Sequence, residues 1–396
     1  MANIPPLDLT QQYQTLGTEV NAAVTALLAS GRYIGGAAVD TFEQGFAAYL
    51  GVPQVVGCNS GTDALYLALR ALDIGPGDEV ITSPFTFFAT AETISAVGAT
   101  PVFVDIDANT FNLDLGQIAA AITPRTRALM PVHLFGQPLD LQHLCALAQD
   151  HHLAVIEDCA QATGADWAGK KVGCWGDVGC FSFFPTKNLG ACGDGGAIAT
   201  GNADLAQRIR ELKEHGSPQR YYHSAIGINS RLDALQATIL TIKLRYLDQW
   251  NQQRRAVADR YTQALQGLPG LKAPQAPQGG TSVWHQYTVR IQNCGSSRRC
   301  DAPTTQPQPC ETQAPRCRDW VRNHLQAQGI STMIYYPVPL HQQAVYQNLG
   351  YQPGQLPQAE QVAREVLSLP MFPELTLDQQ HQVITALKDC LPKIWV

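Results

Sequence analysis

Short runs of Val, Ile, Leu and Phe alternate with stretches of helical apolar spacing between residues 55 and 200. Continuous apolar runs are typical of strands that are covered on both faces. Alternating strands and helices therefore predict an α/β fold with a mainly parallel sheet. The predicted strands are Gln54–Cys58, Glu79–Thr82, Val102–Asp105, Ala128–His133, Ala154–Glu157, Gly179–Phe183 and Gly196–Thr200. The predicted helices between them are Asp63–Leu72, Phe88–Val97 and Leu141–Asp150.

The pattern changes beyond residue 200, where strands and helices no longer alternate regularly. Two helices are predicted first, Leu205–Glu214 and a long amphipathic helix, Leu232–Leu265, that bridges into a second domain. After a Pro- and Gly-rich joint, we predict strands at His285–Ile291 and Thr332–Tyr336, and helices at Trp320–Gln328 and Leu377–Asp389. We therefore expect a large α/β domain over residues 1–250 and a smaller α+β domain over residues 251–396.

Composition narrows the class of protein. The chain has 396 residues, of which 45% are hydrophobic and 15% charged, so it has enough apolar residues for a large core and is not a disordered chain. A formal net charge of −6 provides no broad basic surface for nucleic acid or anionic lipid. We expect no membrane span, because the longest nearly uncharged stretch, Val80–Val104, contains Glu92 and two prolines. We also expect no signal peptide, because no basic residue precedes Arg32.

Eleven cysteines, an odd number, are spread along the chain, which is typical of reduced thiols in a cytoplasmic protein. Residues 293–317 are atypical, because this segment is rich in Pro, Gln and Thr and contains four cysteines. Their spacing includes no C-x₂₋₄-C pair, so a loose surface insertion is favoured over a structural zinc site, and no metal is predicted. The four are Cys294, Cys300, Cys310 and Cys317.

Three motifs carry candidate chemistry, and the first is the turn at Ser60, Gly61 and Thr62 between a strand and a helix. Free backbone N–H groups and the helix dipole at such a turn suit a phosphate. Gly61 permits close approach, and Thr62 supplies a helix cap and a hydroxyl. On this motif alone, an ordinary capped helix without a ligand is the favoured interpretation.

The second motif is a pair of acids, Glu157 and Asp158, at the carboxyl end of a predicted buried strand. Open α/β sheets bind ligands at this end of their strands. An acid in this place binds a metal, orients a base or pairs with a protonated ring nitrogen. A carboxylate that caps the following helix explains the residues equally well.

The third motif places Lys187 in a Gly-rich connection between two apolar strands, after Phe183 and Phe184. Most such lysines are surface residues, but apolar walls lower the pKa of a lysine and allow it to form a Schiff base. The Gly193–Gly196 run matches neither a dinucleotide fingerprint nor a P-loop. Together, the phosphate turn, the strand-end acid and the lysine are the parts needed to hold pyridoxal phosphate (PLP).

With these motifs in place, the sequence resembles the DegT/DnrJ/EryC1/StrS family of nucleotide-sugar aminotransferases, which are fold type I PLP-dependent enzymes. The resemblance covers nearly the whole chain except residues 293–317. It implies a large domain in which helices sandwich a mainly parallel, mixed sheet. The segments that carry it are SGRYIGG (30–36), GPGDEVITSPFTFFATAE (75–92), PVFVDID (101–107), IEDCAQATGA (156–165), SFFPTKNLG (182–190), GINSRLDALQA (227–237) and IYYPVPLH (334–341).

The resemblance assigns roles to the motif residues. Lys187 matches the lysine that forms the internal aldimine with PLP and later moves protons. Asp158 matches the acid that keeps the pyridine nitrogen of PLP protonated, and Gln161 matches a residue near the phenolic oxygen. The other matched cofactor contacts are Gly61, Thr62 and Ser182 at the phosphate and Phe87, otherwise interpreted as a core residue, stacked on the ring.

Two further residues connect the site to a second subunit and to the substrate. Asn229 matches a residue that reaches the phosphate of the neighbouring subunit, which implies a homodimer with shared active sites. Arg231 is a candidate for binding an anionic group of the sugar or of the amino donor. Pairing of Arg231 with Asp233 or another nearby acid explains it equally well.

Tyr335 departs from the family pattern, because many relatives have His before the Tyr-Pro pair. A phenol donates a hydrogen bond but does not titrate near neutral pH. The acid/base role of that histidine therefore does not transfer to Tyr335, which remains a substrate-binding candidate. Lys187 also argues against the family branch of sugar dehydratases, which carry His at that position.

The predicted function is transamination of a keto group on a nucleotide-linked sugar, with glutamate as the expected donor. GINSRLD and the SFFPTK–GDGG stretch most resemble the branch that handles UDP-linked 3-keto sugars, including hexuronic acids. The alternative is a PLP-binding regulatory protein without turnover. A complete set of lysine, acid and phosphate residues favours the enzyme.

Overall fold

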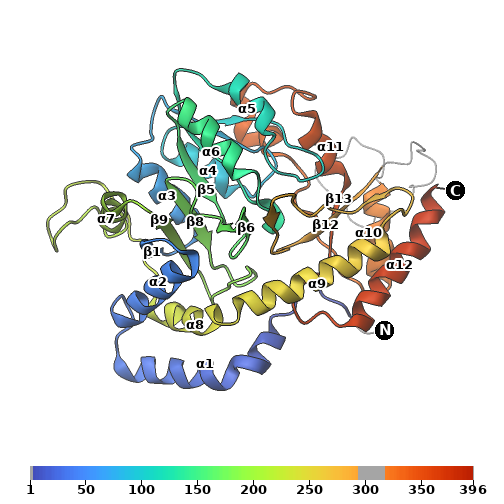
Figure 1. Cartoon of the computed structure of the whole chain (residues 1–396), viewed down its shortest axis with the longest axis horizontal. Helices are drawn as coiled ribbons and strands as arrows, with labels where there is room; N and C mark the ends of the chain where they lie inside the picture. The colour runs from blue at the N-terminus through green and yellow to red at the C-terminus, as the bar shows by residue number, and fades with distance from the viewer. Residues whose placement is uncertain (1–2, 293–316, 396) are drawn as a thin grey trace.

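The computed structural model describes residues 3–292 and 317–395, so most of the atypical segment 293–317 lies outside the described residues. A seven-stranded sheet forms the centre of the larger part, in the order β1-β9-β8-β5-β4-β2-β3 (Figure 1). Strands β3, β2, β4, β5 and β8 are parallel, whereas β9 is antiparallel to both its neighbours. The predicted mainly parallel, mixed sheet is confirmed. Its strands are β1 (Gln54–Cys58), β2 (Glu79–Thr82), β3 (Thr100–Phe103), β4 (Thr126–Met130), β5 (Ala154–Asp158), β8 (Val178–Ser182) and β9 (Gly196–Thr200).

Both faces of this sheet are covered by helices, which explains the continuous apolar runs. Successive strand residues point to opposite faces, and both members of such pairs are apolar. Val55 and Val155 pack in one core with residues of α2 (Ala37–Leu50), α6 (Leu141–Asp150) and α8 (Ala234–Leu244). Val56 and Ile156 pack in a second core on the other face, with residues of α3 (Gly61–Ala71), α4 (Ala89–Ala96) and α7 (Ala203–Leu212).

The sheet brings the three motifs to one edge. Strands β5 and β8 are paired and parallel, and they end at Asp158 and Ser182. Strand β1 is antiparallel to β9, which is antiparallel to β8, so β1 ends at the same edge, just before α3. The connection from β8 to β9 carries Lys187 across this edge. The carboxyl ends of the strands are therefore the place to look for a ligand site.

The C-terminal part packs helices against a three-stranded sheet in the order β10 (Leu271–Lys272), β12 (Tyr287–Ile291) and β13 (Val366–Leu369). Its core contains residues of α9 (Leu247–Leu265), α10 (Cys317–Ala327) and α12 (Leu377–Trp395), and Ile4 from the N-terminal segment joins it. Figure 1 shows α9 running from the larger part to the C-terminal part. Because α9 crosses residue 250 without a break, the predicted domain boundary there stays a prediction.

Two predictions of single elements were wrong. The predicted helix Leu232–Leu265 is two helices, α8 and α9, because the N–H groups of Arg245 and Tyr246 bond to carbonyls three residues back, which tightens the turn. The predicted strand Thr332–Tyr336 makes only an isolated bridge at Met333, after which the chain leaves the sheet to line a cavity.

The remaining elements complete the molecule, and several of them were not predicted. Within the two described ranges, no helix has the length and apolar character needed to cross a bilayer. The remaining helices are α1 (Thr10–Ser30), α5 (Leu115–Ala121), α11 (Pro357–Glu365) and the 3₁₀ turns Leu134–Gly136, Leu340–Gln342 and Ala344–Leu349. The remaining strands are β6 (Asp166–Trp167), β7 (Lys170–Lys171) and β11 (Gly280–Thr281).

Candidate active site

A cavity of about 650 Å³ lies at the carboxyl ends of the central strands and gathers most of the predicted site residues. It also contains residues that the sequence did not single out, among them His285 and Tyr336. Asn229 and Arg231 do not line it. The predicted residues that do are Gly61, Thr62, Phe87, Asp158, Gln161, Ser182, Lys187 and Tyr335.

Asp158, the last residue of β5, is buried at the base of this cavity with both carboxylate oxygens hydrogen-bonded. The Thr90 hydroxyl donates to Oδ2 (2.8 Å), and the Ala160 N–H donates to Oδ1 (3.1 Å). Burial raises the pKa of Asp158, while these two hydrogen bonds and the positive charge of Lys187 act in the opposite direction. The carboxylate thus has donors that stabilise its charged form in a site that otherwise disfavours charge.

Lys187 lies in the connection between β8 and β9, where its backbone N–H donates to the Phe184 carbonyl (2.8 Å). Its side chain lines the cavity, and its Nζ has no hydrogen-bond acceptor among the residues that the structure describes. Burial lowers the pKa of Lys187 to about 8, although the Asp158 carboxylate raises it. A substantial fraction of this amine is therefore neutral near pH 8, as a nucleophile requires.

The start of α3 packs closely against the end of β8. A Cβ atom at Gly61 would lie 2.6 Å from the Ser182 Cβ, so only glycine fits this contact. The expectation that Thr62 caps the helix was wrong: Ser60 is the cap, and its hydroxyl accepts from the Asp63 N–H (3.0 Å). Because Gly61 and Thr62 open the helix, their N–H groups have no intrahelical acceptor and are available to an anion in the cavity.

Gln161 also lines the cavity, where two hydrogen bonds orient its side chain. Its Oε1 accepts from the Phe135 N–H (2.7 Å), and its Nε2 donates to the Tyr336 hydroxyl (3.0 Å). One N–H of the amide is left for a ligand.

Phe87 is 56% exposed, so its interpretation as a core residue was wrong. Tyr335 is half-buried beside these residues, and burial raises the pKa of its phenol.

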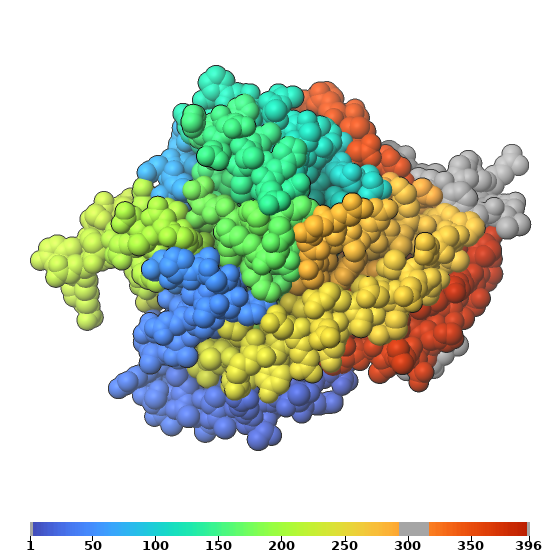
Figure 2. All heavy atoms as spheres, viewed as in Figure 1, coloured from blue at the N-terminus to red at the C-terminus, as the bar shows by residue number. Residues whose placement is uncertain are grey.

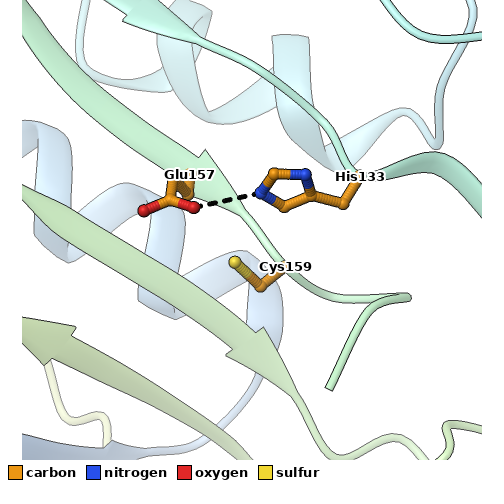
Figure 3. A group of neighbouring side chains, drawn as sticks. All are labelled: His133, Glu157 and Cys159. Carbon is orange, nitrogen blue, oxygen red and sulfur yellow. Dashed lines mark hydrogen bonds and ion pairs between the residues drawn. The ribbon is translucent and has the colours of Figure 1, made fainter. Parts of the chain in front are cut away.

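Glu157 points to the other face of β5, away from the cavity. It lies with His133 and Cys159 in a fully buried group, in which Figure 3 shows the Glu157 carboxylate facing the His133 ring. Its oxygens also accept from the backbone N–H groups of Gly173, Trp175 and Gly176 (2.7–2.9 Å). These contacts anchor the turn before β8 and occupy the carboxylate, so the two adjacent acids have separate tasks.

Asn229 and Arg231 lie outside the cavity of their own chain. Asn229 is exposed and pairs with Glu214 in an isolated bridge. The Arg231 guanidinium is 3.7 Å from the Glu214 carboxylate, rather than paired with Asp233, and both of these side chains are more than one-third exposed. An ion pair this exposed contributes little to stability.

Comparison with known proteins places these features in a family. The model of the DegT/DnrJ/EryC1/StrS aminotransferase family matches residues 14–388. A pleiotropic regulatory protein of Geobacillus stearothermophilus is 47% identical, over 96% of this chain and 97% of that protein. The UDP-N-acetyl-3-dehydro-α-D-glucosamine 3-aminotransferase of Acidithiobacillus ferrooxidans is 46% identical, over 98% of each chain.

Two further comparisons come from Streptomyces venezuelae. Its dTDP-3-amino-3,4,6-trideoxy-α-D-glucose transaminase is 44% identical, over 99% of this chain and 97% of that protein. The crystal structure of DesV in complex with a ketimine intermediate superposes with a TM-score of 0.90, at 45% identity and over 98% of each chain. Both the overall fold and the sequence are therefore shared along nearly the whole chain.

Proposed function

The chain belongs to the DegT/DnrJ/EryC1/StrS aminotransferase family, and from that premise we propose that it transfers the amino group of glutamate to C3 of a UDP-linked 3-keto sugar. That it is a PLP-dependent sugar aminotransferase follows from the family and from relatives at 44–46% identity. The observation that carries the proposal is the cavity in which Lys187 and Asp158 meet. The names of two relatives support C3 as the position of transfer, one with UDP and one with dTDP.

The cavity fits PLP by the chemistry of its own residues. The Lys187 amine has no hydrogen-bond acceptor among the described residues, which leaves it available for the covalent link. Asp158 supplies a buried carboxylate for the pyridine nitrogen. The phosphate is assigned to the N–H groups of Gly61 and Thr62 and the hydroxyl of Ser182, and Phe87 to the face of the ring. When bound, PLP supplies an electron sink for the carbon that loses or gains a proton.

The protein residues then divide the remaining work. Asp158 holds the ring nitrogen in its protonated form by its negative charge. Lys187 takes a proton from the α carbon of glutamate and, in the second half of the reaction, returns one to C3 of the sugar. Two hydrogen bonds orient Gln161, and its remaining N–H would donate to the phenolic oxygen of the cofactor. Tyr335 lines the cavity, and we assign its hydroxyl to binding the sugar.

We also propose a homodimer in which each site is completed by the partner. The segment after α7 projects from the body of the molecule, as the yellow-green chain in Figure 2 shows. It exposes Tyr221 (79%), Tyr222 (68%) and Ile226 (81%), and large apolar side chains gathered in this way are typical of an interaction surface. Asn229 and Arg231 follow on the same segment, away from their own cavity. A second copy of the chain is the proposed occupant, with Asn229 reaching its phosphate site.

A panel of nucleotide-linked keto sugars tests the substrate assignment. Purified protein loaded with PLP is incubated with glutamate and UDP- or dTDP-linked 3-keto and 4-keto sugars, including a hexuronic acid, and amino sugars are quantified by mass spectrometry. We expect the highest kcat/KM with a UDP-linked 3-keto sugar, and none with the Lys187→Ala control. Higher kcat/KM with a dTDP-linked or 4-keto sugar would overturn the assignment.

A second candidate function is PLP binding without turnover, because one relative is named a pleiotropic regulatory protein. The same panel separates the two functions, because a regulatory protein would bind PLP and form no amino sugar. The presence of Lys187 and Asp158 in one cavity favours turnover, since binding alone does not need a proton-transferring amine beside a ring-nitrogen acid.

A further inference from the structure

A chain of buried amide side chains runs from α9 to the residue next to Lys187. Asn188 Nδ2 donates to Asn251 Oδ1 (2.8 Å) and to the Val283 carbonyl (3.0 Å). Asn251 Nδ2 donates in turn to the Thr163 carbonyl (3.1 Å). Since the two carbonyl oxygens only accept, both amides have a defined orientation. The Oδ1 atom of Asn188 is therefore an acceptor that faces away from these partners.

This orientation fixes the tautomer of His285. Its Nδ1 is 3.1 Å from Asn188 Oδ1, so Nδ1 carries the hydrogen, and in a neutral ring Nε2 then carries a lone pair. His285 is 6% exposed and lines the cavity that contains Lys187. No described residue donates a hydrogen bond to Nε2. Nε2 is also not one of the fully buried polar atoms, so it has surface that faces the cavity.

The surroundings of His285 keep the ring neutral and in place. Burial lowers the pKa of His285 well below its usual value, and the positive charges of Lys187 and Arg254 lower it further. Arg254, from α9, also donates to the carbonyls of Trp284 and His285 (3.3 and 3.4 Å). The backbone around His285 is also tightly packed, because a Cβ atom at Gly136 would lie 2.8 Å from the backbone nitrogen of His285. The lone pair of Nε2 is thus a fixed acceptor.

We propose that His285 is a positioning residue for Lys187, whose amine donates a hydrogen bond to His285 Nε2 whenever it is not covalently engaged. The proposal joins two facts: Lys187 Nζ is a donor without a protein acceptor, and His285 Nε2 is an acceptor without a protein donor in the same cavity. It rests on the proposed function, which gives Lys187 its covalent and proton-transfer tasks. A fixed neutral acceptor directs the amine and favours its ammonium form. The charged group that acts on Lys187 is the Asp158 carboxylate, which raises its pKa.

Two substitutions of His285 separate its two nitrogen atoms. Asparagine places an amide N–H near the position of Nδ1, so His285→Asn keeps the donor to Asn188 and loses the acceptor. Glutamine extends an amide to the position of Nε2, so His285→Gln keeps an acceptor for Lys187 and loses the bond to Asn188. A purely structural role predicts damage mainly in His285→Gln. The proposed role predicts damage to Lys187 mainly in His285→Asn.

The measurement is the pKa of Lys187 in cofactor-free full-length protein. It is obtained from the pH dependence of labelling by trinitrobenzenesulfonate, with Lys187 identified by peptide mass spectrometry. We expect the pKa of Lys187 to fall by about one pH unit in His285→Asn, a tenfold loss in ammonium-to-amine ratio, and to stay near that of the unmodified protein in His285→Gln. An unchanged pKa in His285→Asn, or equal changes in both variants, overturns the proposal.

A second measurement keeps the proposal testable if either variant fails to fold, which thermal melting reports. The ¹⁵N shifts of the His285 ring in the unmodified, cofactor-free protein identify the tautomer. The Nδ1–H form is expected, and the Nε2–H form overturns the proposal because it leaves no lone pair for Lys187. Neither measurement contains a sugar, so a failure here is distinct from a failure of the nucleotide-sugar panel.

Discussion

Replacing Asp158 by asparagine removes one negative charge from the active site and little else. In the unmodified protein, Asp158 accepts from the Ala160 N–H and from the Thr90 hydroxyl. The oxygen of an asparagine accepts from Ala160 in the same way, and its nitrogen donates to Thr90. The Thr90 hydroxyl is then free to donate to Thr86 Oγ1, which is 3.1 Å away. We therefore expect Asp158→Asn to fold normally.

The expected effects on stability and on turnover have opposite signs. Burial raises the pKa of Asp158 above its unfolded value, so stability from this group is present at low pH and lost as the pH rises through the folded pKa. At neutral pH the variant avoids this cost, and its cofactor-free form should melt at the same or a higher temperature. A charge-assisted contact to the ring nitrogen contributes roughly 1.5–3 kcal/mol, so turnover should fall by about tenfold to a hundredfold.

The assay is the rate of the glutamate half-reaction, followed by the visible absorbance of the bound cofactor, together with thermal melting. Glu157→Gln is the matched control, because Glu157 precedes Asp158 on the same strand but faces His133. In Glu157→Gln, an amide N–H replaces one carboxylate oxygen and cannot accept from the backbone N–H groups that face it. We therefore expect the free energy of unfolding to fall by roughly 1–3 kcal/mol, with turnover per folded molecule unchanged. Near-normal turnover in Asp158→Asn, or equal losses in both variants, would refute the ring-nitrogen assignment.

Four further predictions follow from the same site. Lys187→Ala should abolish turnover and the visible band of the bound cofactor, and a normal band would contradict the covalent role. The rate constant for capture of PLP by cofactor-free protein, measured by stopped-flow absorbance, should rise about tenfold per pH unit below the pKa of Lys187 (about 8) and level off above it. The reason is that only the neutral amine reacts. A rate constant that does not change from pH 6 to 9 would contradict this prediction. If an Asn229→Ala variant is inactive alone, mixing it with Lys187→Ala should restore part of the activity after verified subunit exchange. The reason is that one active site of the mixed dimer has both residues intact. No recovery of activity would exclude active sites shared between subunits. Arg231→Met should slow the keto-sugar half-reaction of a hexuronic acid by about tenfold to a hundredfold and spare the glutamate half, with Arg231→Lys as a charge-retaining control; damage confined to glutamate would assign Arg231 to the donor.

The central sheet was predictable because its strands are buried on both faces. Strands β1, β2 and β9 begin and end where the apolar runs do, since each face of the sheet meets its own helices. The break between α8 and α9 was not predictable in this way. Arg245 and Tyr246 fit the helical pattern, and only the hydrogen bonds of the folded chain reveal the tightened turn. Periodicity reports which face is buried and is insensitive to a change of direction between two helices.

The candidate site was predictable where chemistry is concentrated in one motif. Lys187 and Asp158 stand in segments whose residue order carries the family resemblance. His285 had no such signal, because its task depends on Asn188, which lies 97 residues earlier in the chain. Thr90 was missed for the same reason, since its contact with Asp158 spans 68 residues. A polar residue that acts through a distant partner becomes visible only when the fold brings the two together.

Burial shifts the pKa values of Asp158, Lys187 and His285 in the direction that favours the neutral form of each group. The hydrogen bonds decide which group keeps its charge. Asp158 has two donors that stabilise a carboxylate, whereas the amine of Lys187 makes no hydrogen bond to the described residues in this structure, and the ring of His285 donates through Nδ1. The site thus places a stabilised anion opposite an amine that is easily deprotonated. This is the combination that PLP chemistry needs, because a protonated ring nitrogen and a nucleophilic amine must be present at the same pH.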